Sequence, residues 1–180
     1  ALDVIEHEGG RDEEKAMVLE KLGGAHDLAG HAQESVQCYE QAVGLFDKFH
    51  EFKACARISV GLSRSLYRSK PTGTQDAVLM LKRNLKYLEA DPESSEAAAF
   101  YSELATRLSG LDPYEMMAWV EKALVAGEKS KNFEAVSLAL WHKSSFLLES
   151  GQIDEGLQLL ERSYELALQH EEYEIAGNDL

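Results

Sequence analysis

The fold is decided by a stretch near the N-terminus, residues 19–42, which reads LEKLGGAHDLAGHAQESVQCYEQA. Its first part carries residues at three- and four-residue intervals, the spacing of one helix face: Leu19, Leu22, Gly23 and His26. Gly30 follows and is expected to end that helix, which begins near Asp12, because glycine adopts left-handed backbone angles without steric strain. A second stripe then runs through Val36, Tyr39, Ala42, Val43 and Phe46. The stretch therefore predicts two amphipathic helices joined by a tight turn.

A two-residue segment, which we call the recurring phrase, is found along the chain at the ends of alternate predicted helices. It occurs at Ala1-Leu2, Ala42-Val43, Asn84-Leu85, Ala123-Leu124 and Ser163-Tyr164, at intervals of 41, 42, 39 and 40 residues. A nearly constant period of this length indicates a repeat protein in which each period is one helical hairpin. No segment alternates apolar and polar residues over a useful length, so no strands are expected.

The repeat period divides the 180 residues into successive hairpins. The second hairpin is expected to have a lengthened connection, Arg68 to Asp76, because this is the richest turn segment in the chain. Its second helix is expected to bury Ala77, Leu81, Leu85 and Leu88. The predicted boundaries are the end of a preceding helix at 1–10, repeats at 11–49, 50–92, 93–131 and 132–170, and the start of a truncated helix at 171–180.

The first repeat resembles the tetratricopeptide repeat. The matching pattern is Leu19-x2-Leu22-Gly23-x2-His26-x3-Gly30-x4-Ser35-x3-Tyr39-x2-Ala42, with His26 where tyrosine is usual and Ser35 where alanine is usual. In this family, small residues lie where the two helices of a hairpin touch, and an aromatic ring fills the gap between neighbouring hairpins. The resemblance implies an all-α fold, a right-handed superhelical α-solenoid of about four antiparallel helix pairs.

A period near 40 residues exceeds the usual 34 of this family. Similar long repeats occur in kinesin light chains, in Leu-Gly-Asn repeat adaptors, and in the sensor arrays of signalling ATPases and LuxR-type transcription regulators. The phrases at both ends suggest a piece of a longer multidomain protein.

Composition restricts the classes of partner. The net charge is -14, which argues against direct binding of nucleic acid, because phosphate recognition requires clustered positive charge. Two cysteines at unrelated positions, Cys38 and Cys55, are read as small buried hydrophobes and fit a cytoplasmic location. No apolar run is long enough to cross a membrane.

Motifs for catalysis are missing from the sequence. The six histidines show no metal-ligand spacing, and neither a phosphate-binding loop nor a nucleophile elbow occurs. We therefore expect no catalytic residues, no metal and no cofactor, and a protein that is not an enzyme.

Stacked hairpins leave one face of their first helices exposed, and in solenoids this face binds partners. Its positions are expected at Met17, Glu20, Gly24, Asp27 and Leu28, then at Arg57, Val60, Arg64, Tyr67 and Arg68, then at Ala99, Ser102, Thr106 and Ser109, and finally at Leu138, Trp141, Ser145 and Leu148. Function must be read from such residues, because the fold alone assigns none.

Positive charge gathers on the second repeat. Residues 48–86 contain nine basic and two acidic side chains, although the rest of the chain is strongly acidic. Lys53, Arg57, Arg64 and Arg68 follow one another at spacings of 4, 7 and 4, which confines them to one helix stripe, and Tyr67 adjoins it. Two interpretations stay open. Nearby acidic side chains or solvent neutralise the stripe, or it binds a carboxylate-rich peptide through bidentate arginine contacts.

Trp141 is a second candidate binding residue, either as an exposed apolar anchor or as part of the core.

The expected function is a non-catalytic scaffold that binds a peptide or protein segment, an acidic one if the stripe is a site. The alternative is a regulatory, effector-sensing array of a signalling ATPase or transcription regulator. Expected partners also include other domains of the same polypeptide and a second copy in an end-to-end homodimer.

Overall fold

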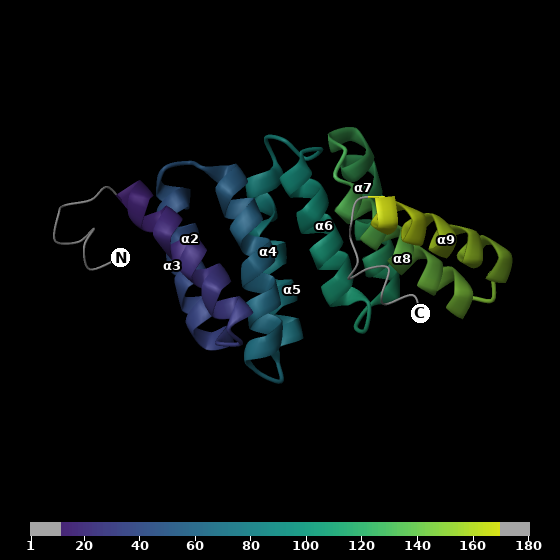
Figure 1. The fold of residues 1–180 in the computed structure, drawn as a ribbon, viewed down its shortest axis with the longest axis horizontal. Helices are drawn as coiled ribbons and strands as arrows, with labels where there is room; N and C mark the ends of the chain where they lie inside the picture. Colours follow the sequence, from purple (N-terminus) through teal and green to yellow (C-terminus); the bar gives the residue numbers. More distant parts are fainter. Residues whose placement is uncertain (1–11, 170–180) are drawn as a thin grey trace. The chain divides into compact units, whose positions relative to one another are not determined.

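The computed structural model describes residues 12–169, and every regular element in that range is helical. The α-helices, labelled in Figure 1, are α2 (Asp12–Leu28), α3 (Ala32–Lys48), α4 (Phe52–Ser69), α5 (Gly73–Asn84), α6 (Ser95–Leu108), α7 (Pro113–Ser130), α8 (Phe133–Glu149) and α9 (Ile153–Gln169). A 3-10 helix, η1 (Leu85–Leu88), follows α5. The all-α prediction is confirmed for this part of the chain. The helices predicted at residues 1–10 and 171–180 lie outside the described residues.

The chain divides into two compact units, Ala1–Ala90 and Asp91–Leu180. In the first unit α2 pairs with α3 and α4 with α5, and α4 also packs on α3 and α2. In the second unit α6 pairs with α7 and α8 with α9, and α8 also packs on α7 and α6. One helix pair therefore falls within each of the four predicted repeat ranges, and neighbouring hairpins within a unit share a core.

The recurring phrase of the sequence marks buried positions. Its first residues, Ala42, Asn84, Ala123 and Ser163, are all almost inaccessible to solvent. The two polar members are satisfied internally, because Asn84 Nδ2 donates to Ser59 Oγ at 2.9 Å and Ser163 Oγ donates to the carbonyl of Ser137 at 2.9 Å. Each period therefore places one residue that is small or internally hydrogen-bonded where the two helices of a hairpin meet.

Tyr39 joins the first hairpin to the second. Its ring lies between two glycines, and a Cβ placed on Gly23 would be 2.7 Å from Tyr39 Cδ1, while one on Gly61 would be 2.8 Å from Cζ. Both separations are below any real carbon–carbon contact, so only glycine at both positions admits the ring between α2 and α4. The expectation that an aromatic fills the gap between hairpins is met by this residue.

Helix ends follow the turn chemistry of the sequence. Gly30 and Gly151, which follow α2 and α8, have φ values of +78° and +82°, the left-handed conformation of a C-terminal glycine cap. Asp112 caps α7, because its carboxylate accepts hydrogen bonds from the backbone N–H groups of Tyr114 and Glu115, and Pro113 occupies the first turn.

The prediction of a long connection from Arg68 to Asp76 is wrong, because the connection between α4 and α5 is short. Helix α4 continues to Ser69 and α5 begins at Gly73, so only residues 70–72 lie between them. Gly73 makes this possible, because a Cβ at that position would lie 2.1 Å from the carbonyl oxygen of Leu66. Lys70 bonds Asp76 at 2.7 Å across the turn and holds the pKa of that carboxyl below its usual value.

The second helix of this hairpin also ends earlier than expected. The α-helical winding stops at Asn84, and residues Leu85–Leu88 form a tighter 3-10 turn. This turn buries Tyr87, whose ring stacks on Phe52 at 5.9 Å, together with Leu88. Leu85, expected to be on the buried stripe, is only half-buried.

The glycines around Tyr39 give a direct test of the packing. Replacing Gly23 or Gly61 with alanine should lower the free energy of unfolding by about 1–3 kcal/mol, because the new methyl group collides with a ring held from both sides. Gly44→Ala is the matched control: it lies within α3 with nothing near its missing Cβ, and the change should raise stability by about 0.5–1 kcal/mol. Urea unfolding of the three variants measures both effects. Equal stabilisation by all three would contradict the packing.

Candidate functional site

The basic stripe of α4 faces two carboxylates of α2. Arg57 donates two hydrogen bonds to the Glu20 carboxylate, from Nε to Oε1 at 2.8 Å and from Nη2 to Oε2 at 3.0 Å. The Arg57 side chain remains 54% exposed, although the Glu20 side chain is only 25% exposed. A planar, bidentate pair of this kind fixes the orientation of the arginine at the surface.

A second ion pair, Arg68 with Asp27, joins the same two helices nearer to their C-terminal ends. Arg68 Nη2 contacts Asp27 Oδ1, and the Ser65 hydroxyl lies 3.0 Å from the same carboxylate oxygen. Ser65 Oγ is in turn 2.8 Å from Ser35 Oγ, which donates to the carbonyl of Gly23 at 2.7 Å. The hydroxyls are buried and the arginine is half-exposed, so this pair is anchored to α2, α3 and α4 together.

The structure places the five α4 candidates on one exposed side of that helix. Lys53, Arg57, Arg64, Tyr67 and Arg68 are all exposed. Met17 and Leu28 of α2 are exposed as well, at 53% and 92%. We call this surface the α2–α4 face: the five candidates with Met17, Glu20, Asp27 and Leu28. Glu20 pairs with Arg57 and Asp27 pairs with Arg68, so the first of the two open interpretations describes these two arginines.

The prediction that Ser102 of the third repeat is exposed is wrong. This residue is buried and its hydroxyl donates to the carbonyl of Ala135 at 2.9 Å, because α6 packs directly on α8. Thr106, expected on the same stripe, is half-buried and contacts the ring of His142. The packing of α6 on α8 thus buries Ser102 more deeply than its counterparts Glu20 and Val60, which are half-buried.

Trp141 lies in the C-terminal unit and is not part of the α2–α4 face. It is half-buried on α8, with its ring against His142 at a centroid distance of 4.8 Å. It lines a pocket of about 360 Å³ together with His142, Phe146 and Glu149. Trp141 is therefore neither a free surface anchor nor a core residue, but one wall of a hollow.

His142 is buried in this wall. Its Nε2 lies 2.9 Å from Thr106 Oγ1, which itself donates to the carbonyl of Ser102. Burial, and then the nearby charge of Arg107, lowers the pKa of His142 from 6.5 to about 4. The ring is neutral at physiological pH.

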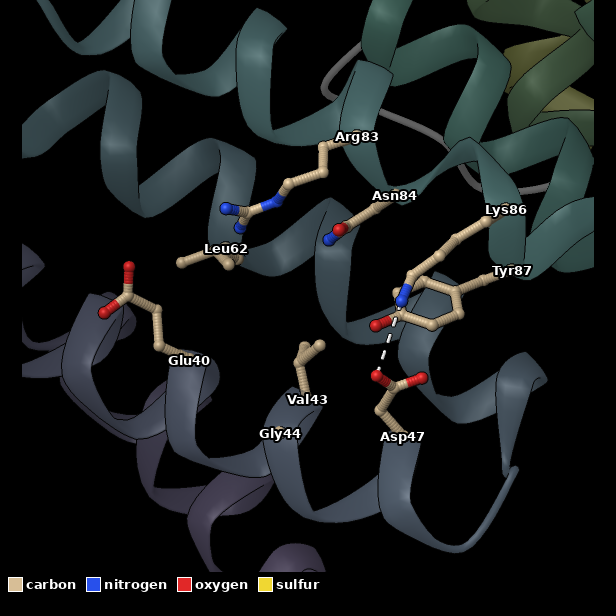
Figure 2. A pocket seen from close by; sticks show the side chains of 9 residues that line it. All are labelled: Glu40, Val43, Gly44, Asp47, Leu62, Arg83, Asn84, Lys86 and Tyr87. Atoms are coloured by element: carbon tan, nitrogen blue, oxygen red, sulfur yellow. Dashed lines mark hydrogen bonds and ion pairs between the residues drawn. The ribbon is translucent and has the colours of Figure 1, made fainter.

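A further hollow, not foreseen from the sequence, lies between α3 and the segment formed by α5 and η1. Figure 2 shows this hollow, of about 350 Å³, which Val43 and Leu62 line together with charged side chains of both signs. Lys86 reaches across to Asp47 at 3.4 Å, and its ammonium lies over the Tyr87 ring. Glu40 and Arg83 face this hollow from opposite walls. No motif predicts it, because its lining comes from α3, α4, α5 and η1 together.

The described residues contain no group of three or more His, Cys, Asp and Glu side chains arranged to hold a metal ion. Cys55 is fully buried, and burial raises the pKa of its thiol to about 11, so it is a thiol and not a nucleophilic thiolate at neutral pH. None of the helices between residues 12 and 169 is both long and apolar enough to cross a lipid bilayer.

No protein family model matches the chain, and no curated protein matches it. The resemblance to tetratricopeptide repeats therefore stays an expectation drawn from the residues quoted above.

The buried ring of His142 makes stability depend on pH. Between pH 6.5 and 4 the unfolded chain binds a proton at this ring and the folded protein does not, so stability falls as the pH is lowered through that range. At pH 5 the loss from this group is about 2 kcal/mol. His142→Gln keeps a hydrogen-bond donor for Thr106 and should remove that part of the loss. Urea unfolding at pH 7 and pH 5 measures it. An equally steep loss in both proteins would show that the ring is not buried and neutral.

Proposed function

We propose that the chain is a non-catalytic protein-interaction module that binds a peptide or protein segment on the α2–α4 face. The proposed architecture is a right-handed, tetratricopeptide-like solenoid. It is supported by the 40-residue period, by one helix pair in each period, and by the small buried residue that each period repeats.

The observation that carries the proposal is the pair of arginines already fixed by carboxylates of the neighbouring hairpin. Arg57 and Arg68 are each about half exposed, yet each is held in place by an acidic side chain. A flexible arginine loses rotamer freedom when a partner binds, whereas one that is already held loses less. The face is thus organised before any partner arrives.

Exposed apolar side chains lie on the same face. Met17, Leu28 and Tyr67 are each more than half exposed, and their burial by a partner would be favourable. An aromatic ring beside fixed arginines is the composition found at the centres of protein interfaces. The surface is suited to a segment that presents apolar residues together with hydrogen-bond acceptors.

The positive charge gathered on the second repeat favours an acidic segment. Residues 48–86 carry nine basic and two acidic side chains, in a protein whose net charge is -14. An acidic partner would therefore be drawn to this face and repelled from most of the remaining surface.

Charge reversal on α4 tests the proposal. Arg57→Glu combined with Arg64→Glu should abolish capture of the partner from a native lysate, and capture by the unaltered protein should weaken as salt is raised above roughly 0.1 M. Thermal stability should change little, because these side chains are exposed.

The matched control reverses the same amount of charge in the same unit, with Lys82→Glu and Arg83→Glu on α5. Quantitative mass spectrometry of the captured proteins should show a set that the unaltered protein and the α5 variant retain and the α4 variant loses. Retention by all three proteins, or loss only with the α5 variant, would refute binding at the α2–α4 face.

A further inference from the structure

The pocket beside Trp141 is built where several helix ends meet within the C-terminal unit. Ser109 and Gly110 follow the C-terminus of α6, Pro113 begins α7, and Glu149 ends α8. Its volume of about 360 Å³ lies within the range of small-molecule sites. Its polar groups can be classified one by one as donors or acceptors.

His142 contributes an acceptor. Thr106 has a single hydroxyl hydrogen, which it donates to the carbonyl of Ser102 at 2.9 Å. We assign that oxygen as the acceptor from His142 Nε2, 2.9 Å away, and this assignment places the ring hydrogen of the neutral imidazole on Nε2. The other ring nitrogen, Nδ1, carries a lone pair and no hydrogen.

The two serines of the pocket are acceptors as well. Ser109 Oγ donates to the carbonyl of Thr106 at 3.0 Å, and Ser145 Oγ donates to the carbonyl of Trp141 at 3.1 Å. Each hydroxyl has used its one hydrogen on its own helix, so a ligand meets only oxygen lone pairs there.

The charges around the pocket are mostly negative and also favour a ligand that donates hydrogen bonds. Glu149 lines it and is exposed, and no ion pair or hydrogen bond joins its side chain to another residue of 12–169. The C-termini of α6 and α8 add the negative ends of two helix dipoles. The positive N-terminus of α7 is capped by the Asp112 carboxylate, and Arg107, whose charge acts on His142, pairs with Glu103 at 3.0 Å.

Two aromatic rings complete the lining. Trp141 and Phe146 both border the pocket, and each is held by another ring, Trp141 by His142 and Phe146 by Tyr114. The electron-rich faces of such rings attract cations, with tryptophan the strongest.

We propose that this pocket binds a small organic cation, an ammonium group carried on an apolar body. Lone pairs and the Glu149 carboxylate receive its N–H groups and charge, and the rings of Trp141 and Phe146 cover its apolar part. An anion of the same size would meet the Glu149 carboxylate and the negative C-terminal ends of α6 and α8, which repel it. This site goes beyond the proposed function, because neither its residues nor its ligand belong to the α2–α4 face.

The test is an NMR titration of the full chain with phenethylamine, followed at the two tryptophan indole N–H signals, which Trp119→Phe assigns. The Trp141 signal should shift saturably in the millimolar range or below, and the Trp119 signal should not. A peptide Gly-Lys-Gly blocked at both ends distinguishes a lysine side chain from a free amine as the source of the ammonium group. 3-Phenylpropionate, an anion of similar size, should cause no saturable shift.

Two variants with the same charge change locate the site. Glu149→Gln should weaken phenethylamine binding roughly threefold, and Glu161→Gln on α9 should leave it unchanged. Trp141→Leu should weaken it roughly fivefold, with far-UV circular dichroism confirming the fold. No saturable shift with either ammonium probe, equal binding of the anion, or an equal loss in both glutamate variants would overturn the proposal.

Discussion

The packing of Tyr39 between Gly23 and Gly61 is the constraint on which the N-terminal unit depends. A single hairpin cannot bury both sides of its helices, so its stability comes from the next hairpin. Here one ring from α3 enters the space between α2 and α4, where the missing side chains of two glycines leave room for it. Because the ring meets both first helices, it also sets the distance at which α2 and α4 face each other.

That distance determines the chemistry of the exposed face. With α2 and α4 this close, Glu20 reaches Arg57 and Asp27 reaches Arg68, while Ser35 and Ser65 tie the carboxylate of Asp27 to the interior. In the C-terminal unit a different close approach, α6 on α8, buries Ser102 and leaves the polar ends of the helices to form a pocket at Trp141. Small differences in helix spacing thus turn one repeated hairpin into two different surfaces.

The sequence predicted the features that local chemistry decides. The limits of α2, the terminating Gly30 and Gly151, and the buried Ala42 and its counterparts follow from periodicity and turn residues. It could not predict features that need two distant segments at once. Gly73 shortens the α4–α5 connection through a contact with Leu66, and the hollow of Figure 2 is lined by residues of α3, α4, α5 and η1 together. The α4 stripe was readable from its spacing, but its partners Glu20 and Asp27 lie about one repeat away.

Hydrogen exchange in a Tyr39→Ala variant tests the coupling between hairpins most directly. If the ring joins them, amide protection falls in both α2 and α4, which flank it, and not only in α3, which carries it. A loss of protection confined to α3, with α2 and α4 exchanging as in the unaltered protein, would contradict the account.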